Sequence, residues 1–211
     1  MQSDPYSLAT LIGSRICHDL ISPLGAVSNG LELLLLSGTE ASPELALVAQ
    51  SVANANARIR FFRLAFGIAS ADQMIGAEEI NSILKDVYTD GRITAETFPS
   101  GSFPRAEVRA VMLALLCAEQ AVPYGGTLAV TQDETGWSIS ATGDRLSPNA
   151  QLWDVLAGVA PAEDVPPSAV QFLMLRDVLP RLGMICSTGV TETAAGIHLK
   201  RASSRPLPQG T

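Results

Sequence analysis

The sequence predicts an antiparallel helical hairpin followed by an α/β sandwich, in which a layer of helices covers one face of a mixed sheet. Three observations point to this α plus α/β fold class. Two long apolar-periodic segments open the chain, and short helical and strand-like patterns alternate after them. Aliphatic residues dominate, whereas aromatic residues make up only 5% of the chain, which suits helix packing with a modest sheet.

The first expected helix begins at Asp4-Pro5, an N-cap followed by proline at the first helical position, and ends at Ser37-Gly38. A second helix begins in the same way at Ser42-Pro43. A connection of roughly four or five residues requires the two helices to run antiparallel. The second helix carries a heptad seam, typical of helices packed lengthwise, at Leu45, Val48, Val52, Ala55, Ile59, Phe62, Phe66 and Ala69.

One hairpin cannot bury all the apolar surface of its first helix. A second copy of the chain, packed as an intermolecular four-helix bundle, would cover the excess, so the sequence favours a homodimer. The alternative is that the rest of the same chain covers the hairpin. The apolar residues in question are Ile12, Ile16, Leu20, Leu24, Val27, Leu31 and Leu34, with Leu11, Leu33, Leu35 and Leu36 in addition.

The remainder of the chain predicts a series of short elements. In order, they are a linker over 70–79, a helix over 78–89, a strand over 92–98, a helix over 104–122, a hairpin of strands 127–132 and 137–142, an irregular lid or loop over 149–167, a helix over 168–182 and strands over 184–189 and 193–200. We therefore divide the chain into a helical-hairpin domain (1–72), an α/β domain (73–201) and a disordered tail (202–211).

Composition excludes several classes of function. The net charge is −7 and no cluster of lysines and arginines occurs, so nucleic acid is not an expected partner. Cys17, Cys117 and Cys186 lie in apolar contexts and are expected to be buried thiols in a reducing compartment, without a metal or disulfide role. No signal-peptide pattern opens the chain and its apolar runs are short, so we expect a soluble cytoplasmic protein that does not enter a membrane.

His18 is one of two histidines, and it lies inside the first expected helix. Because each helical residue advances ~100°, Ile16 and Leu20 face almost opposite to His18, and the apolar stripe runs down the side that His18 avoids. Small and polar residues dominate its own side. The expected partner-binding face comprises Leu11, Ser14, Arg15, Ile21, Ser22, Gly25 and Asn29, with Arg63 added from the second helix.

A lone helical histidine is most often incidental, but the residues after His18 favour a function. Asp19 follows directly, and Pro23 removes a backbone hydrogen bond to the Asp19 carbonyl and predicts a kink. A neutral imidazole nitrogen is a good phosphoryl acceptor if it is exposed and held in line with an incoming aspartyl phosphate. Asp19 either orients or deprotonates the ring, or is a solvated helix charge.

Three arginines of the second helix are expected at the height of His18 in the hairpin: Arg58, Arg60 and Arg63. One of them, for which we select Arg63, would offset the charge on phosphohistidine or meet an acidic partner. The others are expected to be solubilising charges.

The stretch HDLISPLGAVSNGLELL, which starts at His18, resembles the phosphoacceptor helix of sensor histidine kinases, with an acid after the histidine and a proline five residues on. It is more similar to ChpT-type histidine phosphotransferases of alphaproteobacteria, with their His-Asp-Leu, Ser-Pro and Asn-Gly-(hydrophobic)-Glu pattern. The resemblance covers nearly the whole chain, through a sharp motif at His18 and through the layout of elements elsewhere.

Three departures separate the chain from a kinase ATP-binding domain. No asparagine occurs between Arg105 and Pro148, the Asp-x-Gly-x-Gly loop is replaced by ATGDRLSPNA, and residues 168–175 contain no glycine. The resemblance therefore implies a phosphotransferase with a degenerate ATP-binding domain. It implies no cofactor or metal bound by this chain, and Mg²⁺ on the partner receiver domain.

The resemblance also implies the partners. His18 would take a phosphoryl group from the receiver domain of a hybrid histidine kinase and pass it to receiver domains of response regulators, of the CtrA and CpdR types that control the cell cycle. The residues grouped around His18 would then bind receivers. Asn29 lies roughly 16 Å from His18 along the helix axis, too far to touch the phosphoryl group in the same subunit. It is therefore expected either to contact a receiver or to form a cap at Gly30.

Two other functions stay open at the level of sequence. One is an ATP-dependent sensor histidine kinase core, and the other is a non-catalytic dimeric scaffold that only docks receivers. His198 has no partner residue or spacing that marks a site, and it is expected to be structural or exposed.

Overall fold

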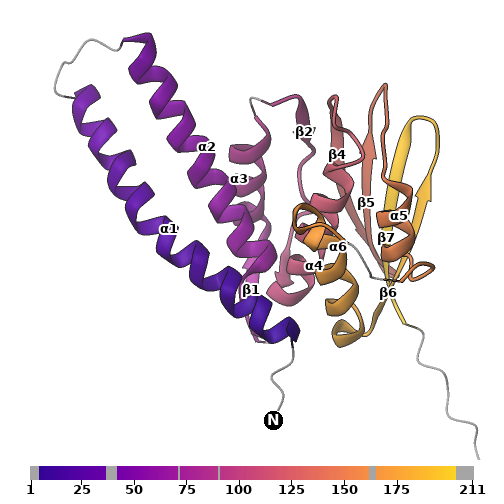
Figure 1. The fold of residues 1–211 in the computed structure, drawn as a ribbon. Helices are drawn as coiled ribbons and strands as arrows, with labels where there is room; N and C mark the ends of the chain where they lie inside the picture. Colours follow the sequence, from indigo (N-terminus) through magenta and orange to yellow (C-terminus); the bar gives the residue numbers. More distant parts are fainter. Residues whose placement is uncertain (1–4, 37–41, 71, 90, 162–164, 203–211) are drawn as a thin grey trace, which may run out of the picture.

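The computed structural model describes residues 5–36, 42–70, 72–89, 91–161 and 165–202 (Figure 1). Two long antiparallel helices, α1 (Pro5–Leu36) and α2 (Pro43–Phe66), form the predicted hairpin, and the lower half of this hairpin lies against an α/β domain. The predicted fold class, a helical hairpin followed by an α/β sandwich, is confirmed.

The start of α2 follows the local chemistry that its sequence indicates. Ser42 accepts a hydrogen bond from the Leu45 N–H at 3.2 Å, and Pro43 occupies the first turn. Along the predicted seam, Ile59 is buried and Phe62 and Phe66 are half-buried, but Ala69 lies beyond the end of the helix. The predicted seam is therefore buried or half-buried along α2 except at Val48, which is 47% exposed, and it ends one position earlier than expected.

The α/β domain is built around a five-stranded mixed sheet in the order β2-β4-β5-β7-β6, in which β2 runs parallel to β4 and the other neighbours are antiparallel. Its elements are β1 (Met74–Gly76), α3 (Ala77–Tyr88), β2 (Ile93–Ala95), β3 (Ser102–Pro104), α4 (Arg105–Glu119), β4 (Gly126–Asp133), β5 (Gly136–Thr142), α5 (Ala150–Leu156), η1 (Pro167–Ala169), α6 (Val170–Val178), η2 (Pro180–Leu182), β6 (Met184–Val190) and β7 (Ala194–Arg201).

Helices cover one face of this sheet, as predicted (Figure 1). Helix α4 lies in the centre of the core, where it is buried along most of its length. Strand residues alternate between the two faces, so Trp137, Ile139 and Ile197 enter the core while Ser138 and His198 remain on the open face.

Four sequence-based expectations for this domain were wrong. The expected linker over 70–79 contains β1, which pairs with β3 in a separate two-stranded sheet, and the strand expected over 92–98 is only β2. The expected lid over 149–167 contains α5, where Asn149 caps the helix and Trp153 is buried. The last helix is divided because proline at position 180 has no N–H to donate.

Charged side chains join the hairpin to the α/β domain. Arg58 of α2 forms a bidentate ion pair with Glu119 of α4 at 2.9 and 3.3 Å, and the Tyr88 hydroxyl donates to the same carboxylate at 2.7 Å. Arg109 of α4 is buried and donates to the Thr10 hydroxyl of α1 at 2.8 Å. The domain boundaries proposed above remain predictions, and the expected tail lies, from residue 203, outside the described residues.

One face of α1 is apolar and uncovered in the single chain. Ile12, Ile16, Leu20, Val27 and Leu34 are between 44% and 54% exposed. By length and composition alone, α1 from Ala9 to Leu36 also satisfies the requirements for crossing a membrane. A different face of α1 packs on α2, so the hairpin exposes one continuous apolar stripe.

Candidate functional site

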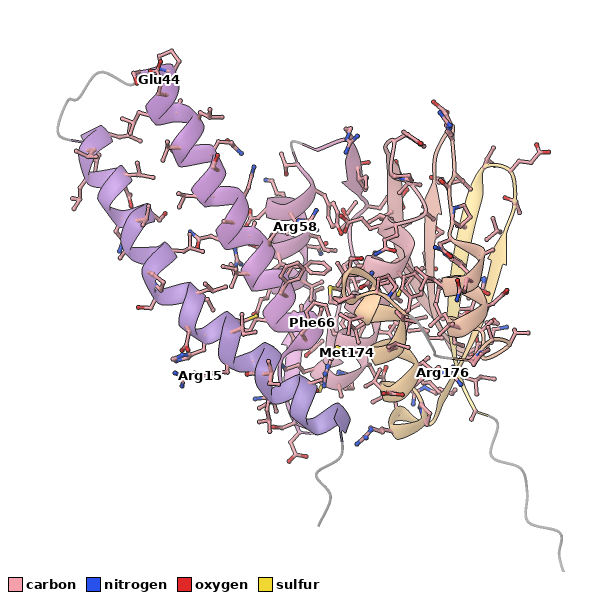
Figure 2. The ribbon with its side chains drawn as sticks, in the orientation of Figure 1. Arg15, Glu44, Arg58, Phe66, Met174 and Arg176 are labelled. Atoms are coloured by element: carbon pink, nitrogen blue, oxygen red, sulfur yellow. The ribbon has the colours of Figure 1, made fainter. Side chains whose placement is uncertain are left out.

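His18 lies in the N-terminal half of α1, and its side chain is 82% exposed. The ring faces away from the packed interior, in agreement with the predicted orientation. Figure 2 shows the side chain of Arg15, one helical turn away, pointing outward from the same helix. An exposed imidazole can be reached by another protein without any rearrangement of this chain.

Two polar contacts, which link three side chains, define the surroundings of the ring. His18 Nδ1 lies 3.1 Å from Asp19 Oδ1, and Arg15 Nε donates to Asp19 Oδ2 at 2.7 Å. The hydrogen bond from His18, and after it the charge and hydrogen bond of Arg15, lower the pKa of the Asp19 carboxyl. An ionised carboxylate only accepts hydrogen bonds, so a neutral His18 carries its proton on Nδ1 and leaves the lone pair of Nε2 free.

The other residues of the predicted partner-binding face divide into two groups. Leu11, Arg15, Ser22 and Asn29 are exposed, as expected. The second group is half-buried because these residues flank the row of α1 that packs on α2, a consequence of tertiary packing that a single helix cannot reveal. This second group is Ser14, Ile21 and Gly25.

Small residues bring α1 and α2 close together beside His18. A Cβ atom at Gly13 would lie 3.2 Å from the Cβ of Phe66. Cys17, which precedes His18, is only 6% exposed. Burial raises the pKa of the Cys17 thiol, and the charge of Arg63 on α2 partly opposes this rise.

The three arginines of α2 therefore have different surroundings. Arg58 pairs with Glu119 and Arg60 pairs with Asp86 at 2.6 Å, so both join the two domains instead of serving as the expected solubilising charges. Arg63 is exposed, and no described carboxylate forms an ion pair with it. Arg63 is thus the α2 guanidinium left available to a partner near His18.

The polar residues of the α/β domain form contacts of their own. His198 lies on the open face of the sheet, where its Nδ1 is 2.7 Å from the Ser138 hydroxyl oxygen. Within the described ranges, no group of three or more His, Cys, Asp or Glu side chains could hold a metal ion. Glu119 and Tyr88, which the sequence did not single out, acquire their role only because α3 and α4 meet α2.

Comparisons with known proteins agree with this geometry. A family model described as the histidine phosphotransferase C-terminal domain matches residues 77–194. The chain is 34% identical over 172 residues to the protein phosphotransferase ChpT of Brucella abortus (strain 2308), a match that covers 78% of this chain and 81% of that protein. It also resembles a solved bacterial phosphotransferase, with 27% identity, a TM-score of 0.67, and coverage of 95% of this chain and 98% of the other.

Proposed function

This chain belongs to the histidine phosphotransferase family that includes ChpT, and from that membership we propose that it carries a phosphoryl group on His18 between two receiver domains. The family membership makes the chain a protein phosphotransferase with a role in a phosphorelay. The observation that carries the proposal for His18 is its exposed imidazole, whose Nδ1 lies against Asp19 so that Nε2 faces solvent.

The transfer step follows from this arrangement. The Nε2 lone pair attacks the phosphorus of an aspartyl phosphate on the donor receiver, and a P–N bond forms as the P–O bond to the aspartate breaks. The donor aspartate leaves as a carboxylate. The proton on Nδ1 remains hydrogen-bonded to Asp19, whose negative charge balances the positive charge that develops on the ring. Transfer to the acceptor aspartate is the reverse of this step.

Partners and cofactors follow from the same proposal. The donor is the receiver domain of a hybrid histidine kinase, and the acceptors are response-regulator receivers of the CtrA and CpdR types. The receiver supplies Mg²⁺ to neutralise the phosphoryl oxygens, and this chain binds no cofactor or metal of its own. All of these partners are cytoplasmic, and so is the proposed location of this chain.

We also propose that the exposed stripe of α1 packs against a second copy to form an intermolecular four-helix bundle. The heptad spacing of apolar residues on two antiparallel helices supports a second copy of the chain as the partner, because this spacing is typical of four-helix bundles. The membrane alternative is disfavoured because Arg15 and Asp19 lie within the same stretch, where a bilayer would have to accommodate their charges.

Phosphotransfer from a phosphorylated receiver tests the assignment. Incubation with a receiver that carries labelled phosphate on its aspartate should label the chain, and His18→Ala should abolish the label. His198→Ala is a matched control that should keep full transfer. Label that persists in His18→Ala would reject His18 as the acceptor. A wild-type chain that binds the receiver but acquires no label would favour the scaffold alternative.

The proposed docking face can be tested separately from the chemistry. A Cβ atom added at Gly25 would meet no atom within 4 Å in the single chain, so Gly25→Leu should fold normally. It should weaken receiver binding because it enlarges a face lined by small residues. Receiver affinity equal to that of the wild type would contradict the docking role of this face.

A further inference from the structure

A buried glutamine in the α/β domain has no hydrogen-bond partner. Gln171, in the first turn of α6, is only 6% exposed, and within the part of the chain that the structure describes its side-chain amide makes no hydrogen bond. Buried polar groups in native proteins are almost always satisfied, so each exception requires an explanation. Gln171 borders a cavity, and an occupant of that cavity would supply the missing partner.

The cavity lies between the hairpin and the α/β domain and has a volume of about 600 Å³. This size is within the range of small-molecule sites. Phe62 and Phe66 of α2 form one wall, where their ring centroids are 5.6 Å apart. Leu116 of α4 and Pro167 before α6 line other parts of it. Figure 2 shows Phe66 on the side of α2 that faces the α/β domain.

The charges around the cavity do not cancel. Arg58 and Glu119 both border it, but they neutralise each other in their ion pair. Arg92, in the loop before β2, also borders it, and no described carboxylate forms an ion pair with the Arg92 guanidinium. One unpaired positive charge therefore stands beside the cavity.

These groups together define a type of ligand. An amide presents a donor and an acceptor side by side, and its complement is a lactam or another carboxamide. Aromatic and proline side chains favour a flat apolar body. A single guanidinium favours one anionic substituent. We propose that this cavity binds a small planar heteroaromatic ligand that pairs its lactam or carboxamide edge with Gln171 and places one anionic group at Arg92.

Calorimetric titration with uridine 5′-monophosphate, uridine and ribose 5-phosphate tests the proposal. Uridine monophosphate has both the lactam edge and the anionic group, whereas each of the other probes lacks one of them. We expect uridine monophosphate to bind most tightly, uridine to bind more weakly and ribose 5-phosphate not to bind. Failure of both lactam probes to bind at millimolar concentration would overturn the proposal, and so would tighter binding of Mg²⁺-ATP, which carries more charge than one arginine can neutralise.

Two variants assign the contacts. Gln171→Leu keeps the volume of the side chain and should lower the affinity for uridine monophosphate by at least about tenfold. Arg92→Ala should weaken the binding of uridine monophosphate and leave the binding of uridine unchanged. Gln151→Leu, at an exposed position of α5, is the matched control and should bind as the wild type does. Wild-type affinity in Gln171→Leu, with an unchanged thermal midpoint, would reject the site. This result would leave phosphotransfer by His18 untouched, because the assay does not involve it.

Discussion

At the scale of single residues, Asp19 contacts both His18 and Arg15. The carboxylate lies between the imidazole and the guanidinium, and all three side chains are well exposed. Exposed ion pairs contribute little to folding stability, so this cluster is better explained by its effect on the ring than by its effect on the fold. The adjacent His and Asp in the sequence predicted the contact between His18 and Asp19, whereas the ion pair between Arg15 and Asp19 depends on the rotamers of both side chains.

Asp19→Asn should lower the rate of phosphotransfer, on the order of 10- to 100-fold, without unfolding the chain. An asparagine can turn its N–H₂ towards Nδ1, which would place the ring proton on Nε2 and block the attacking lone pair. Rapid-quench transfer assays would measure the effect, with the exposed Asp72→Asn as control. Equal transfer rates for Asp19→Asn and the wild type would show that Asp19 is only a solvated helix charge.

The pH dependence of the Asp19 contact has a definite sign. Its pKa is lowered from a usual value of 3.8, chiefly by the hydrogen bond with His18. A carboxyl with a lowered pKa in the folded state contributes stability above its unfolded pKa and loses it as the pH falls through the folded value. The contact therefore persists at neutral and mildly acidic pH.

At the scale of elements, the hairpin depends on the close approach of α1 and α2. Gly13 lies where a side chain would press on Phe66, whereas Gly30 faces open space on the same helix. The two glycines are thus alike in sequence and different in structure.

Alanine substitutions at these glycines should separate the two situations. Gly30→Ala should stabilise the chain by about 0.5–1 kcal/mol, because glycine in a helix interior costs that much relative to alanine. Gly13→Ala should be less stable than Gly30→Ala, because Phe66 must move to accept the new methyl group. Urea unfolding measures both, and a higher midpoint for Gly13→Ala than for Gly30→Ala would contradict the close packing.

The junction between α2 and the α/β domain contains two ion pairs of different kinds. Glu119 is mostly buried and accepts from both Arg58 and Tyr88, while Asp86 and Arg60 are both exposed. Burial and the neighbouring Glu119 charge raise the pKa of the Tyr88 hydroxyl well above its usual value, so it remains a donor.

Removing one charge from each pair should therefore have unequal effects. Glu119→Gln should cost about 1–3 kcal/mol, since it leaves a half-buried guanidinium without its partner. Asp86→Asn should cost less than about 1 kcal/mol, as expected for an exposed pair. Equal losses in chemical denaturation would show that the burial of Glu119 does not strengthen the junction.

At the scale of the whole molecule, the uncovered stripe of α1 is the observation that supports the proposed packing of two copies of the chain. Five large aliphatic side chains on one helix face are about half exposed, and a monomer rarely leaves such a continuous patch in water. The α/β domain covers the base of the hairpin from the other side, so it cannot shield this stripe.

Light scattering should therefore give a mass of about twice the 22.2 kDa of one chain. Ile16→Glu should shift the mass towards that of one chain, because it places a charge in the proposed interface. Val159→Glu, at an exposed position of the α/β domain, should not change the mass. A wild-type mass equal to one chain would contradict the intermolecular bundle.

Local patterns were sufficient for much of this protein. The period of the apolar residues, the caps at Ser42 and the acid after His18 identified the hairpin and the outward imidazole, because these properties depend on residues within a few turns of one another. Alternation likewise identified the β4–β5 and β6–β7 hairpins. Only the tertiary structure paired β1 with β3, joined Arg58 to Glu119 and enclosed Gln171. Each of these depends on segments that are distant in sequence, and contacts of that kind leave no periodic signal along the chain.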